Sequence, residues 1–351
     1  MNTQIRPMPK NYFSIRFALL VCFLAWIVIM LGAYTRLKDA GLGCPDWPGC
    51  YGQITVPQTA QQIKAAASAY PHQPVEAAKA WPEMIHRYFV GALGISIIAL
   101  GVVSYRKRRK NKAVFILSLA ALGVVIFQAL LGKWTVTMRL LPTVVMGHLI
   151  GGFTLLVLLW LIFLRLGEYG QRLNRPDTSL QKWGILGWAL IILQIILGGW
   201  TSANYAALIC PDFPFCQGQL IPPLDFKTAF NFLMPIGQNF QGGVLTKPAQ
   251  ITIQFMHRLG ALITFLYIGW FSLRCMFAKT PIIRYLGIGL MVTLFIQITL
   301  GILNIELMLP VFVAVAHNGM AAILLLWMTT LLYYLSIGAN REKINAYKRS
   351  Y

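Results

Sequence analysis

Charge is what this sequence has least of. Aspartate and glutamate together number 10, and all charged residues make up 11% of the 351 residues, against about 25% in typical soluble domains. Hydrophobic residues account for 57%, and the mean hydropathy is +0.64. This composition excludes a water-soluble globular domain and indicates that lipid is most of the solvent.

Long apolar runs take the place of the missing charge. Each is long enough to cross a bilayer as a helix, which needs about 20 residues. The runs cover residues 16–34, 84–104, 113–132, 143–164, 183–201, 250–273, 283–303 and 311–336. The sequence therefore predicts an all-α integral membrane protein with eight transmembrane helices, in contact with the lipid bilayer.

The basic residues are arranged as in a membrane protein. The formal net charge is +20, but Lys and Arg fall in short blocks between apolar runs, without the interleaved aromatic residues of an RNA-binding surface. We therefore expect no nucleic-acid partner. Twenty of the 30 basic residues lie in the two tails and the short connections on one side. The positive-inside rule then predicts that both termini are cytoplasmic and that the long loops 35–82 and 202–249 face outward.

The N-terminal segment gives no sign of a cleaved targeting sequence. It is short and poor in serine before the first span, which itself lacks a small-residue cleavage site. We expect a multi-pass protein of a bacterial inner (plasma) membrane. A mitochondrial protein whose presequence has been removed is the alternative.

The chain repeats itself. The segment from Cys44 to Cys50 matches the one from Cys210 to Cys216 at an offset of 166 residues, and the flanking ends of spans one and five match at the same offset. Later segments match at offsets of 169 and 171 residues, including Gln128–Gly132 with Gln297–Gly301. Because four spans separate matched segments, the repeats run in the same sense across the membrane. This predicts two tandem pseudo-symmetric four-helix bundles.

The repeat also predicts the domain organisation. The expected units are a cytoplasmic N-terminal tail 1–15, an N-terminal bundle 16–168, a cytoplasmic linker 169–182, a C-terminal bundle 183–336 and a basic cytoplasmic tail 337–351.

Four histidines recur with the repeat. His86, His148, His257 and His317 lie two to seven residues inside the predicted even-numbered spans, all at the outward end. Ionisable residues within spans are usually functional, although a histidine hydrogen-bonded across a helix interface is the alternative. Two facing imidazoles per bundle suit the axial positions of a heme iron. Zinc fits less well, because it favours three or four converging ligands.

Several other residues are candidates at these sites. Glu83 precedes His86 by three residues, whereas the matching position holds Gln254, so the first site is predicted to do proton chemistry and the second to carry electrons. A glutamate favoured by the helix dipole is the alternative. Arg36, Arg87 and Arg258 are candidates to contact heme propionates or to anchor helix ends. Some glycines could admit a porphyrin edge: Gly91, Gly94, Gly147, Gly151, Gly152, Gly260 and Gly319.

Two cysteine pairs lie in the long outward loops, each with five residues between its members. Disulfides are plausible on the oxidising side of a membrane. They could staple the loops structurally or act as redox couples with a thiol partner.

The combination resembles the heme A synthase family over residues 16–336. The likeness rests on Glu83-Met84-Ile85-His86-Arg87, the histidines on even-numbered helices, Thr35-Arg36-Leu37 and the cysteine loops. It implies oxidation of a methyl group of heme O to the formyl group of heme A, with water as the oxygen source, for cytochrome oxidase assembly. The methyl oxidation follows from the resemblance alone.

The resemblance also implies residue roles. His257 and His317 would ligate a heme b, His86 and His148 would hold the substrate heme, and Glu83 would lie beside the reacting methyl group. Cys44–Cys50 and Cys210–Cys216 would be disulfides. Implied partners are heme O, heme O synthase and an electron acceptor such as a quinone, with a homo-oligomer left open.

Two other functions remain open at this point. One is a diheme b-type membrane cytochrome that carries electrons from quinol. The other is a quinone-linked thiol oxidoreductase built on the cysteine pairs.

Overall fold

The computed structural model describes residues 12–167 and 179–349, with side chains from 14 to 167 and from 180 to 336. Most of the predicted tail 1–15 and linker 169–182 lies outside these ranges, as do the side chains of the predicted tail 337–351.

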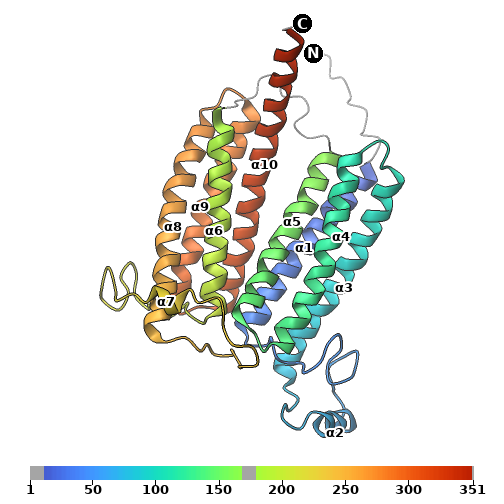
Figure 1. The fold of residues 1–351 in the computed structure, drawn as a ribbon, viewed down its shortest axis with the longest axis vertical. Coiled ribbons are helices and arrows are strands. Elements are labelled where there is room, and N and C mark those ends of the chain that lie inside the picture. The colour runs from blue at the N-terminus through green and yellow to red at the C-terminus, as the bar shows by residue number, and fades with distance from the viewer. Residues whose placement is uncertain (1–11, 168–178, 350–351) are drawn as a thin grey trace.

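Within the described residues, eight helices are long and apolar enough to span a membrane, as predicted. They are α1 Tyr12–Leu37, α3 Ala77–Arg106, α4 Lys112–Thr137, α5 Pro142–Leu166, α6 Ser179–Ala203, α8 Lys247–Met276, α9 Pro281–Glu306 and α10 Val311–Arg349. Two short helices, α2 Ala60–Ala69 and α7 Phe226–Ala229, lie in the long loops (Figure 1). The described ranges contain no strand beyond two isolated bridges.

Two of the four histidine-bearing helices begin three or more residues before their apolar runs. Helix α3 starts at Ala77 rather than at 84, and α8 starts at Lys247 rather than at 250, because their first turns are polar but still helical. The histidines are therefore the tenth, seventh, eleventh and seventh residues of α3, α5, α8 and α10. The predicted distance of two to seven residues from the helix start is wrong for α3 and α8, where the histidines lie roughly 14–15 Å past the first residue of the helix.

The helices fall into two sets by their contacts. In the first set α1 packs on α3 and α5, and α4 also packs on α3 and α5. In the second set α6 packs on α8 and α10, and α9 packs on the same two helices. Among the described residues no Cα atom of α3 lies within 8 Å of one of α5, and the same holds for α8 and α10, so each of these pairs is diagonal within its set. The sets meet through α1 on α10, α5 on α6 and α5 on α10 (Figure 1).

The main apolar core occupies one end of the helices. It draws on the early residues of α1 and the late residues of α3, including Ala18, Val21, Ile97 and Leu100. Every other span contributes residues from the same end to this core, and Leu159 of α5 is one of the fully buried side chains. The histidines lie toward the opposite end, where each ring lies against a glycine of a neighbouring helix. The core therefore holds the helices together and leaves the histidine level to other groups.

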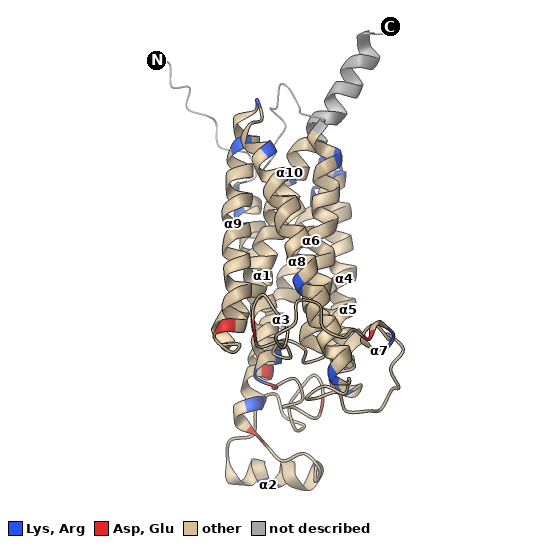
Figure 2. Cartoon of the chain, turned by 90° about the vertical axis from the view of Figure 1, so that its left-hand side faces the viewer, with Lys and Arg blue, Asp and Glu red and all other residues tan. Residues whose placement is uncertain are grey.

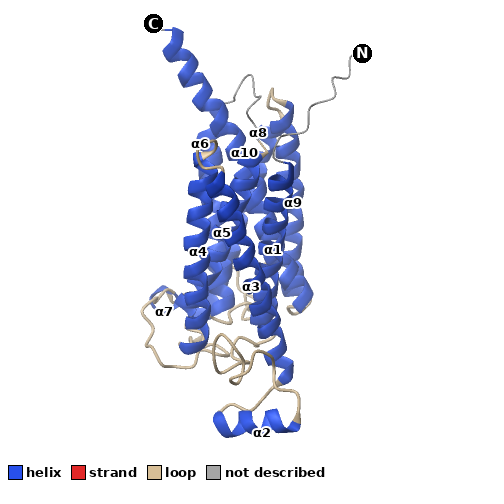
Figure 3. Ribbon diagram, turned by 90° about the vertical axis from the view of Figure 1, so that its right-hand side faces the viewer, coloured by secondary structure: helices blue, strands red, loops and turns tan. Residues whose placement is uncertain are grey.

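Charge also separates the two ends of the bundle. Basic residues mark the end that carries the short α3–α4 and α8–α9 connections, while the acidic residues gather at the loop-bearing end (Figure 2). The acidic residues with described side chains are Asp39, Asp46, Glu76, Glu83, Asp212, Asp225 and Glu306. Figure 3 shows the two long loops, with α2 and α7, at that same end.

The long loop of the second set reaches over to the first. The backbone N–H of Phe240 donates to the carbonyl of Arg139 at 3.1 Å, and the Phe240 ring is buried against Leu140 and Leu141 at the α4–α5 turn. A second link joins α1 to α6 directly: Arg36 donates from Nη2 to the carbonyl of Ser202 at 2.6 Å. The two sets are therefore joined at the loop end as well as through the core.

Candidate functional site

The four predicted histidines meet in two pairs. His86 on α3 lies close enough to His148 on α5 to interact with it electrostatically, and His257 on α8 does the same with His317 on α10. Each pair comes from the two diagonal helices of one set. Two imidazoles therefore approach the centre of each set from opposite sides.

The histidine level contains buried polar atoms without hydrogen-bond partners among the described residues. They include Nδ1 of His86, His148 and His317. Side-chain amide atoms of Gln128, Gln254 and Gln297 share this property, as does Oε1 of Gln194. Each such atom costs about 1–3 kcal/mol, so a cluster of them calls for a polar group between the helices. In the structure these three histidine nitrogens make no hydrogen bond across a helix interface.

Glutamine side chains touch two of the rings. Nε2 of Gln194 lies 3.0 Å from Nδ1 of His257 and donates to the His257 carbonyl at 3.0 Å. Nε2 of Gln297 lies 3.3 Å from Nε2 of His317. The position that matches Gln194 in the first repeat is Val28, so the two histidine pairs differ in their surroundings.

Glu83 is buried, with 5% of its surface exposed. Its Oε2 accepts the backbone N–H of Cys44 at 3.0 Å, and its Oε1 accepts from Nη2 of Arg87. The alternative of a helix-start glutamate is wrong, because Glu83 is the seventh residue of α3 and the dipole effect fades beyond the first turn. The carboxylate is instead fixed by the first cysteine loop and by Arg87.

Arg87 and Arg258 hold the two cysteine loops. Nη1 of Arg87 donates to the carbonyls of Asp46 at 2.9 Å and Pro48 at 3.2 Å, and to that of Gly49. In the second repeat, Nη1 of Arg258 donates to the carbonyls of Asp212 at 2.8 Å and Phe215 at 2.6 Å. These contacts support the predicted anchoring role, and the predicted propionate contacts stay a prediction.

The two arginines differ in the partner of their second terminal nitrogen, Nη2. Nη2 of Arg258 donates to the carbonyl of Cys210 at 2.6 Å, whereas Nη2 of Arg87 donates to Glu83. Gln254, which occupies the position of Glu83, is also buried, with 3% exposed. The glutamate thus takes over a bond that a loop carbonyl accepts in the other repeat.

Arg36 lies at the junction of the two sets. Besides its bond to Ser202, its guanidinium stacks 3.8 Å from the centre of the Tyr205 ring, and Nη1 lies 3.4 Å from Oδ1 of Asp39. The Tyr205 hydroxyl donates to the same Asp39 oxygen at 2.9 Å. The pKa of Tyr205 is raised above its usual value, mainly because the side chain is partly buried. The hydroxyl therefore keeps the proton that it donates to Asp39.

Both predicted disulfides are present. Cys44 is bonded to Cys50 and Cys210 to Cys216, with Cα–Cα distances of 4.8 and 4.6 Å. Inside the second loop, Asp212 accepts the backbone N–H groups of Gln217 and Gly218, both at 2.7 Å. The bond from Gly218 is the largest cause that holds the pKa of Asp212 below its usual value. Each loop is thus closed by a disulfide and internally hydrogen-bonded.

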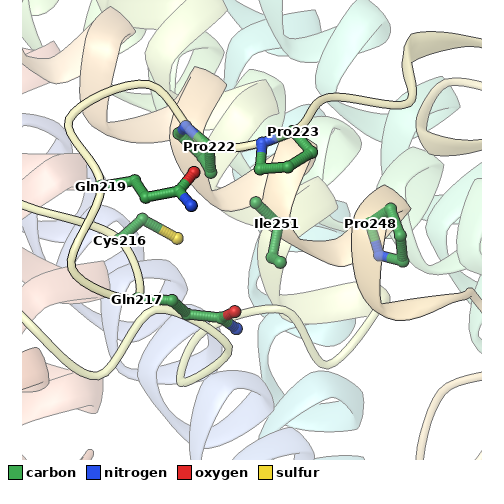
Figure 4. A pocket seen from close by; sticks show the side chains of 7 residues that line it. All are labelled: Cys216, Gln217, Gln219, Pro222, Pro223, Pro248 and Ile251. Atoms are coloured by element: carbon green, nitrogen blue, oxygen red, sulfur yellow. The ribbon is translucent and has the colours of Figure 1, made fainter.

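A cavity of about 190 Å³ opens beside the second disulfide (Figure 4). It is lined by Cys216, Gln217, Gln219, Pro222, Pro223, Pro248 and Ile251. None of the four histidines lines it, so it is separate from the histidine pairs. Among the described residues, no three His, Cys, Asp or Glu side chains gather as a metal-binding group.

Four glycines at the histidine level are absent from the predicted set. Each ring lies against one glycine of a neighbouring helix: Gly32, Gly132, Gly198 and Gly301. Gly91 and Gly94 face open space, and their predicted contact with a porphyrin edge stays a prediction. The sequence does contain a pattern that could have identified these four glycines, because they recur at the repeat offsets of 166 and 169 residues.

Comparison with known proteins gives a consistent family. Residues 15–329 match the family model COX15-CtaA, described as cytochrome oxidase assembly protein. The chain is 43% identical over 312 residues to the heme A synthase of Shewanella oneidensis, covering 88% of this chain and 92% of that protein. It is 30% identical over 334 residues to the heme A synthase of Allorhizobium ampelinum, covering 87% and 86%. The heme A synthase of the Wolbachia endosymbiont of Brugia malayi is 25% identical over 338 residues.

Proposed function

The chain belongs to the heme A synthase family, and from that membership we propose that it oxidises a methyl group of heme O to the formyl group of heme A for cytochrome oxidase assembly. The observation that carries the proposal is the pairing of buried histidines from diagonal helices, surrounded by unpaired polar atoms. The overall change adds one water oxygen to the methyl carbon and releases four electrons and four protons. The protein is thus an oxidoreductase that needs an electron acceptor, for which a quinone is our proposal.

The two sets of helices are proposed to be tandem pseudo-symmetric bundles, 16–168 and 183–336. Matched helices support this: α1 packs on α10 as α6 packs on α5, which is the pattern of a two-fold axis along the membrane normal. Matched residues also meet one another, since Arg36 contacts Ser202 and Asp39 contacts Tyr205, each at an offset of 166 residues.

We propose a bacterial inner membrane with both termini, the linker 169–182 and the tail 337–351 in the cytoplasm. The basic residues at the end opposite the long loops support this orientation. The two disulfides support it as well, because disulfides persist on the oxidising side of a membrane.

The residues at each histidine pair fit a heme. A bound heme would supply an iron that takes an imidazole on each face, and the diagonal helices present one imidazole from each side. Zinc would need a third or fourth ligand near the pair. The unpaired amide atoms of Gln128 and Gln297 are polar groups available to a heme edge. Arg36, Arg87 and Arg258 remain candidates for propionate contacts.

We assign different hemes to the two pairs. His257 and His317 are proposed to hold heme b, and His86 and His148 are proposed to hold the substrate heme. The support is the single carboxylate, since Glu83 precedes His86 by three residues on α3 whereas Gln254 takes its place in the second repeat. Glu83 is the proposed catalytic residue: it can take a proton at Oε1 or Oε2 as the methyl carbon is oxidised. Gln254 cannot, so the second pair serves electron transfer.

Heme O synthase is the proposed source of the substrate, and self-association into a homo-oligomer is compatible with the proposal. The cysteine pairs act in it as loop staples, because their loops position Glu83 and the two arginines.

Extraction of hemes from the purified protein tests this function. Chromatography is expected to show heme b together with heme O or heme A, and added heme O is expected to be converted to heme A when a quinone is supplied. A diheme cytochrome would instead carry two like hemes in equal amounts and convert nothing. Protein that stays colourless even after addition of heme would refute the proposal.

A further inference from the structure

Each histidine ring is placed by a glycine on the neighbouring helix. The ring atom nearest to the glycine is in every case Cε1, the carbon between the two nitrogens. A Cβ added to the glycine would lie at these distances from Cε1: 3.0 Å for Gly198 and His257, 3.1 Å for Gly301 and His317, 3.2 Å for Gly32 and His86, and 3.5 Å for Gly132 and His148. The same edge of each imidazole therefore faces a helix backbone that only glycine leaves open.

Three of these distances are shorter than the usual approach of a methyl carbon, so the ring would have to shift by a few tenths of an ångström. Two carbon atoms are most stable about 3.5–4.0 Å apart, so a side chain at Gly198, Gly301 or Gly32 would displace the ring it faces. A displacement of about half an ångström is already enough to spoil a ligand geometry. Gly132 lies at the edge of ordinary contact and would disturb His148 least.

For three of these glycines, the residue one helical turn earlier also lies near the ring: Val28 before Gly32, Gln128 before Gly132 and Gln297 before Gly301. Nδ1 of His86, His148 and His317 makes no hydrogen bond in the structure. An imidazole that ligates a metal through Nε2 usually donates Nδ1–H to a carbonyl or a carboxylate. The backbone beside the glycine is therefore the acceptor that we expect for each of these rings when iron is bound.

We propose that Gly32, Gly132, Gly198 and Gly301 are positioning residues that set the orientation of the four imidazoles for iron. The inference rests on the proposed function, because it assumes that the histidines hold hemes. It adds that the neighbouring helices, α1, α4, α6 and α9, determine the ligand geometry although they carry no ligand themselves. The glycines act only through the rings, so their replacement changes the iron ligation before it changes the fold.

The test is a titration of the purified, heme-depleted protein in detergent with hemin, followed by absorption and electron paramagnetic resonance spectra. The parent protein is expected to give a low-spin signal with two imidazole ligands. Gly198→Ala and Gly301→Ala are each expected to weaken hemin binding at the second pair at least tenfold and to convert bound hemin to a high-spin form. A purely structural role predicts no such spectral change, since alanine favours a helix more than glycine does.

Helical glycines that face no histidine ring are the controls. Gly123→Ala on α4, the helix that carries Gly132, adds a methyl group that meets nothing within 4 Å, and Gly269→Ala on α8 places it 3.9 Å from Leu294. Both are expected to keep the parent spectrum and affinity. In the first repeat, Gly32→Ala is expected to disturb binding more than Gly132→Ala, in the order of the distances.

The outcomes separate the inference from the function. A parent protein without the two-imidazole signal would refute the proposed function. A normal parent with Gly198→Ala and Gly301→Ala within twofold of its affinity and unchanged in spectrum would overturn only the glycine inference. If Gly198→Ala does not fold, it is combined with His257→Ala: recovery of folded protein supports a collision with the ring, and no recovery overturns the inference.

Discussion

Replacement of Glu83 by glutamine separates proton chemistry from structure at the first histidine pair. The carboxylate accepts two hydrogen bonds, from the Cys44 N–H at 3.0 Å and from Arg87. Glutamine keeps one acceptor oxygen but turns an NH₂ group toward the other donor. The direct cost is one charge-assisted hydrogen bond, about 1.5–3 kcal/mol.

The second repeat indicates how the variant would adapt. There Gln254 accompanies Arg258, whose Nη2 donates to the carbonyl of Cys210 at 2.6 Å. Arg87 can turn its Nη2 to the matching carbonyl of Cys44 and recover about 1 kcal/mol. We therefore expect Glu83→Gln to lose only about 1–2 kcal/mol of stability, well below the 3–5 kcal/mol for breaking a buried ion pair without compensation.

The catalytic loss should be far larger. General acid–base groups contribute about 10²–10⁴-fold in rate, so Glu83→Gln is expected to lower conversion of heme O to heme A by that range while heme b stays bound at His257 and His317. The assay is chromatography of extracted hemes over time, with the heme b content measured in parallel. Glu76→Gln is the matched control, because Glu76 is exposed at the same helix end and pairs only with Lys79. A variant that loses its heme yet keeps turnover would refute the assigned role.

Three further predictions concern the other residues of the site. His257→Ala is expected to lose heme b and all turnover, and pigment retained at the parent level would contradict the ligand assignment. The double replacement of Cys210 and Cys216 by serine is expected to cost about 2 kcal/mol in thermal unfolding through the lost cross-link, with heme b retained because Arg258 still holds three loop carbonyls; loss of heme b at unchanged stability would speak against a staple. Arg36→Ala is expected to cost about 1–3 kcal/mol, since it removes the bond to Ser202 and the stacking on Tyr205, and a double-mutant cycle with Tyr205→Leu that proves additive would exclude the stacking contribution.

The sequence alone predicted the eight spans, because each apolar run has the length that a bilayer requires and the polar residues between runs mark its ends. The prediction of helix ends was less accurate where the helix extends beyond the apolar run. The first two turns of α3 contain Lys79 and Pro82, and α8 begins at Lys247; these residues lower hydropathy without ending a helix. The histidines on these two helices consequently lie farther from the helix start than predicted.

The sequence also singled out the histidines and both cysteine pairs, since the repeat places them at matched positions. It singled out Glu83 because the matched position holds Gln254. It left open what Arg87 and Glu83 contact. Their bonds to the first cysteine loop join α3 to residues about 40 positions earlier, and no local pattern encodes such a distance.

What the sequence determined by itself is the set of membrane spans, the repeat and the residue types that can bind a heme, because these depend on hydropathy and spacing along one chain. Only the tertiary structure decided which helices are diagonal, which loop groups fix Glu83 and which glycines face the rings. Those features depend on the packing of helices from different parts of the chain, where a difference of a few tenths of an ångström determines whether a side chain fits.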